Sequence, residues 1–360
     1  MRYRDFDEDD VPMRPSRRGS RPRTKRRPEY SDAVPGMVTA IDRGRITVLL
    51  EPDESRDNGR GGGSREVVAI KARTLGRKAL VVGDGVSVVG DISGRPDTLA
   101  RIVRISKRST TLRRTADDDD AYERVIVANA DQLVIVTALA DPEPRQRMVD
   151  RCLVAAFDAG MDALLCLTKA DLAPAEEFVA PYEALNVPYV TTSLAEDGSI
   201  IGVDAVLDHL RGKVSALVGH SGVGKSTLVN ALSPSAEREI GSVNITTGRG
   251  RHTSTSAVAF PLNDDAGWVI DTPGIRSFGL AHIDPDRIIS AFTDLAPATT
   301  MCPRGCTHDA DAPGCALDGW VAEGNAGAHG KQRLDSLRRV LASRSETDYY
   351  RPAARSIPQL

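Results

Sequence analysis

A glycine-rich segment in the middle of the chain has the residue types of a phosphate-binding loop. It matches GxxxxGK[ST] between a predicted strand at 214–218 and a predicted helix that runs to Leu232, and its residues are Gly219, His220, Ser221, Gly222, Val223, Gly224, Lys225, Ser226 and Thr227. Glycines let backbone N–H groups turn inward around phosphates, and the helix N-terminus adds positive potential. Lys225 is expected to reach the β and γ phosphate oxygens in catalysis, and Ser226 to bind Mg²⁺. The pattern favours a nucleoside triphosphate site over a glycine-rich turn that contains a lysine by chance.

A second motif, DTPG, follows a short apolar run and spans Asp271 to Gly274. An aspartate at a strand tip beside a phosphate loop is placed to hold Mg²⁺, and the Gly274 N–H is a candidate catalytic donor to a γ-phosphate. Between the two motifs, residues 248–255 have the glycine and hydroxyl content of a mobile switch loop. Either Thr253 or Thr255 is expected to join the magnesium site, and the sequence leaves that choice open.

Two earlier segments predict that the base is guanine. An apolar run at 163–167 ends in TKAD, which resembles the NKxD element of GTP-binding proteins with threonine in place of asparagine. In that element the aspartate carboxylate accepts two hydrogen bonds from guanine, which adenine cannot supply, and such sites discriminate by about 10⁴-fold. The threonine leaves fewer hydrogen bonds to brace the loop, so we expect modest affinity. The segment at 192–195 resembles the loop that backs the base, and the predicted contacts are Thr168, Lys169, Ala170, Asp171, Ser193 and Leu194.

The order of these motifs is unusual. The familiar GTPase chain runs from the phosphate loop through the switch and DTPG to the base motif, whereas here the base motif comes first. This order predicts a circular permutation, which a compact α/β domain tolerates because its termini often lie close together. It also places DTPG beside the C-terminal segment, so nucleotide state is able to act on that segment directly.

A cysteine and histidine cluster in the C-terminal segment predicts a metal centre. Three thiols and one imidazole within a short stretch suit a closed tetrahedral zinc site, which is structural because no ligand position is open. Free surface cysteines are the alternative in a reducing compartment. Cys152 and Cys166 lie in apolar runs and are expected to be core residues. The predicted zinc ligands are Cys302, Cys306, His308 and Cys315.

Length and composition indicate the kind of protein that carries these sites. The chain has 360 residues, is 41% apolar and carries a net charge of −3, which fits several soluble domains and excludes a global attraction to nucleic acid. Basic residues are concentrated between Arg14 and Arg27, either as a solvated tail or as an RNA-contacting arm. No apolar run approaches the about 20 residues of a membrane helix, and no signal-peptide pattern is present. We therefore expect a cytoplasmic protein with no membrane partner.

Periodicity predicts the elements that position the sites. Short β-type runs at 37–41, 45–50, 66–72, 85–90 and 99–105 favour a five-stranded barrel of the oligonucleotide-binding (OB) type, with an SH3-like barrel as the alternative. Apolar strands at 132–137 and 163–167 flank a helix at 145–159, which argues for a mostly parallel sheet covered on both faces. The predicted organisation is a disordered basic arm at 1–33, the barrel at 34–114, an acidic linker at 115–121, a circularly permuted P-loop GTPase domain at 122–284 and a zinc-binding, mainly helical domain at 285–360.

The end of the chain contains one further pattern. Leu334, Leu337 and Leu341 recur at helical spacing among basic residues, which predicts either a solvated amphipathic helix or an RNA contact. No long heptad pattern indicates a coiled-coil partner, and we expect a monomer. The basic residues of this helix are Lys331, Arg333, Arg338, Arg339 and Arg344.

The segments GHSGVGKST, GRGRHTST, DTPGIRSFGL and the CxxxCxH…C cluster closely resemble the circularly permuted GTPases that depend on the small ribosomal subunit, the RsgA or YjeQ family. The resemblance covers roughly residues 35 to 345. It implies an OB-type barrel, a permuted GTPase domain and a zinc domain. It also implies binding to the small ribosomal subunit and its rRNA in late maturation, where the subunit stimulates hydrolysis of GTP to GDP. The chain departs from the family in its basic arm, its Gly61–Gly63 insertion, Thr168 and its zinc-loop spacers.

The position after the DTPG glycine bears on catalysis. Many small GTPases carry glutamine there to orient the attacking water, but Ile275 has no group that hydrogen-bonds to water. Slow intrinsic hydrolysis is therefore expected. Either a partner or an in-chain residue completes the site; His252 is the catalytic candidate, ahead of Arg249 and Arg251, and RNA contact or packing is its alternative role.

Two other function classes fit parts of the pattern. A metabolic P-loop ATPase or kinase predicts adenine preference and a small-molecule pocket. A nucleic-acid-binding module with a vestigial nucleotide site predicts no hydrolysis, and the intact Lys225, Ser226 and Asp271 weigh against it.

Overall fold

The computed structural model describes residues 30–51, 65–76, 79–115, 123–233, 257–263, 266–272, 280 and 283–345. Several predicted features lie outside these residues, namely most of the basic arm, the Gly61–Gly63 loop, the acidic run, Gly274, Ile275 and the switch loop with Arg249, Arg251, His252, Thr253 and Thr255. Among the residues described, none of the helices combines the length and the apolar character that crossing a lipid bilayer requires.

The N-terminal strands close into a five-stranded barrel, as predicted. Strand β1 pairs with β2 and β4, β2 pairs with β3, and β3 runs parallel to β5, which pairs with β4. Alternate residues along the strands point inward, because successive side chains of a strand face opposite sides, and they form a separate apolar core. The strands are β1 (Val34–Asp42), β2 (Arg45–Leu50), β3 (Arg65–Lys71), β4 (Gly85–Gly90) and β5 (Ala100–Ile105), with a short 3₁₀ helix, η2 (Arg73–Leu75), between β3 and β4.

The second region is a mostly parallel sheet with helices on both faces, also as predicted. Its order is β10-β9-β8-β13-β15, all parallel, with β14 added antiparallel at the edge. Odd and even residues of the central strands enter two apolar clusters, one shared with α1 and the other with α3 and α4. The strands are β8 (Gln132–Ala138), β9 (Asp162–Thr168), β10 (Tyr189–Thr191), β13 (Lys213–Gly219), β14 (Val258–Pro261) and β15 (Gly267–Asp271). The helices are α1 (Gln146–Ala159), α2 (Glu176–Val179), η3 (Ala180–Leu185), α3 (Val203–Leu210) and α4 (Lys225–Leu232).

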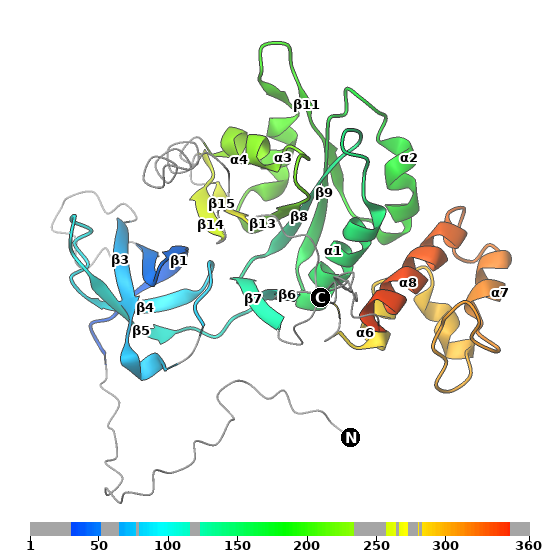
Figure 1. The fold of residues 1–360 in the computed structure, drawn as a ribbon, viewed down its shortest axis with the longest axis horizontal. Coiled ribbons are helices and arrows are strands. Elements are labelled where there is room, and N and C mark those ends of the chain that lie inside the picture. Colours follow the sequence, from blue (N-terminus) through cyan, green and yellow to red (C-terminus); the bar gives the residue numbers. More distant parts are fainter. Residues whose placement is uncertain are drawn as a thin grey trace, which may run out of the picture.

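Between these regions lies a hairpin that the periodicity did not reveal. Strands β6 (Thr111–Thr115) and β7 (Glu123–Ala128) pair antiparallel. The acidic run that we predicted as a linker between domains connects these two paired strands. Figure 1 shows β6 and β7 between the barrel and α1.

Strand β14 connects the sheet of the GTPase region with the barrel. It pairs with β15 on one side and with β1 on the other, where Ala40 lies opposite Val258. One sheet of 11 strands therefore runs from β10 to the barrel. In Figure 1, β14 and β15 lie on the side of the parallel sheet that faces the barrel.

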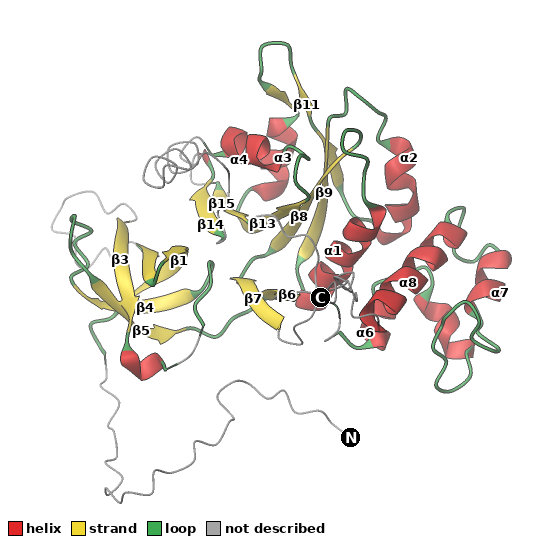
Figure 2. Cartoon of the chain, viewed as in Figure 1, coloured by secondary structure: helices red, strands yellow, loops and turns green. Residues whose placement is uncertain are grey.

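The C-terminal region consists of helices and loops (Figure 2). Its helices are α6 (Pro285–Ser290), η5 (Ala296–Met301), α7 (Leu317–Ala322) and α8 (Gly330–Ser345). Leu334, Leu337 and Leu341 are buried in the apolar cluster that also contains α1 residues. Because this face packs on the GTPase region, α8 is an amphipathic helix with a buried side.

Two ion pairs join α8 to the rest of the chain, one buried and one with an exposed arginine. Arg333, predicted as a solvated cation, is 2% exposed; its Nε lies 3.5 Å from Asp294 Oδ2 and its guanidinium 4.3 Å from the Phe292 ring centroid. Arg339 Nη2 lies 3.5 Å from Oδ2 of Asp150, a buried residue of α1. Burial raises the pKa of the Asp150 carboxyl, because the ionised form loses its hydration. Of the basic residues predicted for this helix, Arg333 is thus buried, whereas Arg339 keeps an exposed face.

Candidate nucleotide site and metal centre

The phosphate loop lies where β13 ends and α4 begins. Gly222 and Gly224 have φ of +86° and +89°, a region in which side chains are strained. A Cβ on Gly219 would lie 2.7 Å from the Val136 carbonyl oxygen, so only glycine fits beside β8 there. Helix α4 has no side-chain cap and no acidic residue in its first turn. Its first N–H groups thus remain available as donors to an anion.

Strand β15 delivers an acidic group to this loop. Asp271 lies opposite Leu217 of β13 in the parallel register. The Lys225 ammonium forms an ion pair with Asp271 Oδ1, and the two side chains are 10% and 23% exposed. The next residue, Thr272, donates from Oγ1 to the Leu217 carbonyl at 2.5 Å, which fixes the strand tip. Lys225 and Asp271, both predicted site residues, are therefore neighbours.

Thr168 connects the base loop with the phosphate loop. Its buried Oγ1 lies 2.6 Å from the Val223 carbonyl oxygen and donates to it across 55 residues of sequence. Gly224 also lies close, since a Cβ there would be 3.8 Å from Thr168 Oγ1. Lys169 has a left-handed φ of 57°, and its ammonium donates to the Asp141 carbonyl. The threonine at the asparagine position thus makes a direct contact that the sequence alone did not reveal.

The loop at residues 192–195 is hydrogen-bonded to the base loop. The Ala170 N–H donates to the Thr192 carbonyl at 3.1 Å. Ser193 and Leu194 form β11 (Ser193–Leu194), which pairs with β12 (Ile200–Ile201). Asp171 is exposed, and Leu194 is 60% exposed. The two predicted base loops are therefore hydrogen-bonded neighbours, with the Asp171 carboxylate open to solvent.

One group of residues beside the phosphate loop was missed by the sequence reasoning. A small pocket is lined by His220 and Val223 together with residues that follow β8, among them Pro142, Glu143 and Arg145. The available signal was the strand β8, because the carboxyl ends of parallel strands meet at one edge of the sheet. The residues after β8 must consequently lie beside the loop after β13.

The four predicted metal ligands come together between η5 and α7. The ligand atoms of Cys302, Cys306, His308 and Cys315 all lie within 4.8 Å of one another. Cys302 Sγ and Cys315 Sγ lie 3.7 and 3.8 Å from His308 Nδ1. A tetrahedral zinc ion separates a sulfur and a nitrogen ligand by about 3.5 Å, given bonds of about 2.3 and 2.0 Å. The cluster is therefore compatible with a zinc ion.

Surrounding groups orient this cluster. Ala316 donates its N–H to Cys302 Sγ at 3.3 Å. Arg338 of α8 donates to the His308 carbonyl at 3.2 Å and makes a bidentate pair with Asp318 at 3.0 and 2.7 Å. The Asp318 hydrogen bonds raise the pKa of Arg338. The Arg338 hydrogen bond holds the backbone of His308 in place. The imidazole Nδ1 is thereby kept facing the sulfurs of Cys302 and Cys315.

The remaining predictions concern four further site residues and the two cysteines expected in the core. His252, Thr253, Thr255 and Gly274 lie outside the described residues, so their roles stay predictions. Cys152 and Cys166 are fully buried core residues, as expected, and burial raises the pKa of the Cys166 thiol to about 12. Neither cysteine belongs to the metal cluster.

Comparisons with known proteins agree on one family. A family model described as RsgA GTPase matches residues 105–281. A protein of Ectopseudomonas mendocina named small ribosomal subunit biogenesis GTPase RsgA is 40% identical over 278 residues, which span 75% of this chain and 77% of that protein. The protein of the same name from Pseudomonas fluorescens strain SBW25 is 38% identical over 278 residues, with the same shares of 75% and 77%.

Solved structures show the same fold. The crystal structure of YjeQ from Thermotoga maritima superposes with a TM-score of 0.62 at 24% identity and covers 87% of this chain and 99% of that one. YloQ, described as a circularly permuted GTPase, has a TM-score of 0.61 at 22% identity and covers 88% of this chain and 96% of that one. The predicted circular permutation is thereby confirmed at the level of the fold.

Proposed function

Because the chain belongs to the RsgA GTPase family, we propose that it hydrolyses GTP to GDP and phosphate in the maturation of the small ribosomal subunit. GTP hydrolase activity follows from the family itself. The relatives carry the name small ribosomal subunit biogenesis GTPase, and this chain acts on the same particle. One observation supports a working nucleotide site above all others, the Thr168 hydrogen bond that joins the base loop to the phosphate loop.

Each site residue has a specific role in this proposal. Asp171 reads guanine by accepting from its ring N–H and exocyclic amine, and the loop at Ser193 and Leu194 backs the base. The backbone N–H groups from Gly219 to Thr227 surround the phosphates, with Lys225 on the β and γ oxygens. The remaining GTP contacts of the base loop are Thr168, Lys169 and Ala170.

The ion pair between Lys225 and Asp271 keeps both charges at the phosphate loop, ready to bind phosphate and Mg²⁺. Each charge neutralises the other within the loop, and a bound nucleotide offers each a new partner. Lys225 turns to phosphate oxygens, while Asp271 and Ser226, with Thr253 or Thr255, would hold Mg²⁺. A Mg²⁺ ion held there would neutralise the negative charge that develops on the phosphates during transfer.

Hydrolysis is slow without a partner, because Ile275 stands where many GTPases have a glutamine. His252 is the proposed group that orients the attacking water, and Gly274 donates its N–H to the γ-phosphate. The variant His252→Ala is expected to retain GTP binding and to lose subunit-stimulated turnover. Unchanged stimulated turnover in this variant would assign the role to a ribosomal group instead.

The cluster of Cys302, Cys306, His308 and Cys315 is the proposed site of one structural zinc ion. Its four donors leave no coordination position for substrate. The three thiols bind as thiolates, so metal binding releases protons and is coupled to folding of the C-terminal region. We further propose a monomeric, cytoplasmic protein whose partners are the small subunit and its rRNA.

The experiment that tests the function measures GTP hydrolysis by the purified chain with and without small ribosomal subunits. We expect slow turnover alone and strong stimulation by the subunit, with GTP preferred over ATP in competition. The variant Lys225→Ala controls for contaminating activity. A preference for ATP would favour a metabolic ATPase or kinase, and hydrolysis that subunits do not stimulate would remove the ribosomal role.

A further inference from the structure

A tight turn of the barrel lies in contact with the GTPase region. We name residues 81–84, which connect η2 to β4, the docking turn. The Val82 side chain is 3% exposed and belongs to the apolar core of the GTPase region, together with Leu112 and Val127, and not to the barrel core. Val82 also forms a parallel bridge with Val127, and the Ala128 N–H donates to the Val82 carbonyl at 3.0 Å.

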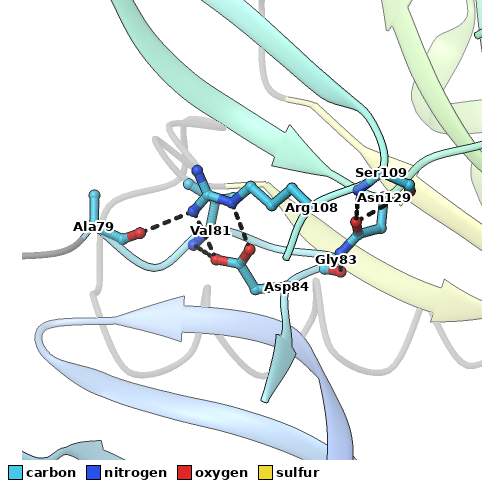
Figure 3. Close-up of polar contacts among 7 residues, drawn as sticks. All are labelled: Ala79, Val81, Gly83, Asp84, Arg108, Ser109 and Asn129. Atoms are coloured by element: carbon cyan, nitrogen blue, oxygen red, sulfur yellow. Dashed lines mark hydrogen bonds and ion pairs between the residues drawn. The ribbon is translucent and has the colours of Figure 1, made fainter. Parts of the chain in front are cut away.

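Side chains on both sides hold the docking turn in place (Figure 3). Asp84, which is fully buried, accepts from Arg108 Nε at 2.7 Å and Nη2 at 2.9 Å, and from the Val81 N–H at 2.8 Å. Asn129 donates from Nδ2 to the Gly83 carbonyl at 2.8 Å and accepts from the Ser109 N–H and hydroxyl at 2.8 and 3.2 Å. Because Arg108 holds Asp84 through two parallel hydrogen bonds, this ion pair fixes the orientation of the docking turn as well as its distance from Arg108.

Gly83 shows how closely the two regions approach. Its φ is +89°, and a Cβ there would lie 1.9 Å from the Ala128 carbonyl oxygen. No side chain fits this gap without displacing the backbone of one region. The barrel is therefore seated directly on the GTPase region at this turn.

The docking turn also lies between the two successive partners of one edge of β1. Residues Val34 to Met37 of β1 pair with β4 and close the barrel. Val38 then exchanges hydrogen bonds with the docking turn, donating to the Asp84 carbonyl and accepting from Gly83, both at 2.9 Å. Beyond a bulge, Ala40 pairs with Val258 of β14. The turn thus stands where this edge of β1 passes from β4 of the barrel to β14 of the GTPase sheet, while the other edge stays paired with β2.

The path from β1 to the nucleotide site is short. Val258, the partner of Ala40, is also the partner of Asp271 in β15. Neighbouring strands lie about 4.8 Å apart, so Ala40 is about 10 Å from the residue that pairs with Lys225. The β15 tip is therefore connected to β1 of the barrel through the pairings of Val258.

We propose that the docking turn, held by Arg108 and Asn129, couples the barrel to the nucleotide site, so that contacts made by the barrel control GTP hydrolysis through β1, β14 and Asp271. This proposal rests on the proposed function for its ribosomal partner. Arg108 and Asn129 are positioning residues, since they touch neither nucleotide loop. For binding, the coupling is reciprocal: nucleotide state changes the affinity of the barrel for its partner by the same factor as the partner changes nucleotide affinity.

Two variants uncouple the barrel while leaving the nucleotide loops unaltered. Asn129→Gly removes three side-chain hydrogen bonds and keeps the left-handed φ of 55° accessible. The double variant Asp84→Asn with Arg108→Met removes the ion pair without leaving a lone buried charge. Arg211→Met is the matched control, because Arg211 pairs with Asp208 at 3.4 Å on an exposed surface.

The first readout is hydrogen exchange of the β1 and β14 amides with bound GDP or a non-hydrolysable GTP analogue. In the wild type and in Arg211→Met, we expect nucleotide-dependent protection that extends from β14 into β1. In Asn129→Gly this dependence is lost from β1, while β8 amides remain protected as a check on folding. Nucleotide-dependent protection of β1 that persists in Asn129→Gly would overturn the proposal.

The second readout is GTP hydrolysis with small ribosomal subunits. Both uncoupled variants are expected to retain basal turnover and GTP affinity and to lose about ten-fold of the stimulation, within the usual range of allosteric coupling. Full stimulation in both variants would overturn the proposal. If subunits fail to stimulate the wild type, the ribosomal function is wrong, and the exchange readout still decides whether the coupling exists.

Discussion

Replacing Thr168 by valine removes the hydroxyl that joins the base loop to the phosphate loop while keeping a similar volume. Thr168 is 6% exposed, and its Oγ1 lies 2.6 Å from the Val223 carbonyl oxygen. Without this donor the carbonyl of Val223, itself 4% exposed, loses a partner. An unsatisfied buried acceptor costs about 1–3 kcal/mol.

This cost is expected to appear in nucleotide affinity. The hydrogen bond holds the phosphate loop in one conformation before nucleotide arrives, and a loop that must be ordered on binding weakens the complex. A loss of about 1.4 kcal/mol corresponds to a ten-fold higher dissociation constant. We therefore expect Thr168→Val to bind both GTP and GDP about ten-fold more weakly.

The assay is a titration with a fluorescent GDP or GTP analogue, combined with thermal unfolding. Thr168→Ser keeps the hydroxyl and is expected to bind nearly as the wild type does, whereas Thr168→Asn tests the expectation that asparagine braces the loop better. Wild-type affinity in a folded Thr168→Val variant would refute the reasoning, because the hydrogen bond would then not position the loop.

Three further outcomes are expected from single substitutions. Asp171→Asn should weaken GTP binding by about 100-fold or more and improve xanthosine triphosphate binding in competition titrations, since the amide donates to the oxygen that xanthine carries; unchanged GTP affinity would show that Asp171 does not read the base. Asp294→Asn should lower the free energy of unfolding in urea by about 3 kcal/mol, because buried Arg333 loses its counter-charge. An unchanged free energy of unfolding in Asp294→Asn would show that this buried pair does not stabilise the fold. Cys306→Ser should reduce the zinc content from about one ion per chain and lower the melting temperature, as measured by elemental analysis and calorimetry; full zinc retention would remove Cys306 from the ligand set.

Local patterns determined much of the fold. The strands expected at 45–50 and 85–90 have those bounds in the structure, because alternating apolar residues between turn residues leave few other arrangements. The phosphate loop was recognisable for a similar reason, since its glycines and Lys225 are contiguous. Elements and motifs that are complete within about ten residues are readable from sequence alone.

Elements that depend on distant partners were harder to predict. In the β6–β7 hairpin, Arg114 lies opposite Arg124, a like-charge pair that sequence preferences disfavour. Arg333 looked like a solvated cation because its partner, Asp294, comes 39 residues earlier and meets it only in the fold. The contact of Thr168 with Val223 likewise spans 55 residues. In each case a tertiary partner outweighs the local pattern.

The permuted order of the motifs determines which strands of the sheet connect to the barrel and to the C-terminal region. The chain enters the parallel sheet from the barrel through β7 and β8, and β8 ends beside the pocket at His220. It leaves the sheet through β15, whose last residue is Asp271, and continues into the C-terminal region. Both appended regions are therefore joined to strands whose ends line the nucleotide site. In the familiar order, the chain would instead begin at the phosphate-loop strand β13, and β15 would lead on to β8 and then to β9, the strand of the base motif. The permutation thus places a covalent connection to each appended region on a strand of the nucleotide site, and the docking turn adds hydrogen bonds to the connection with the barrel.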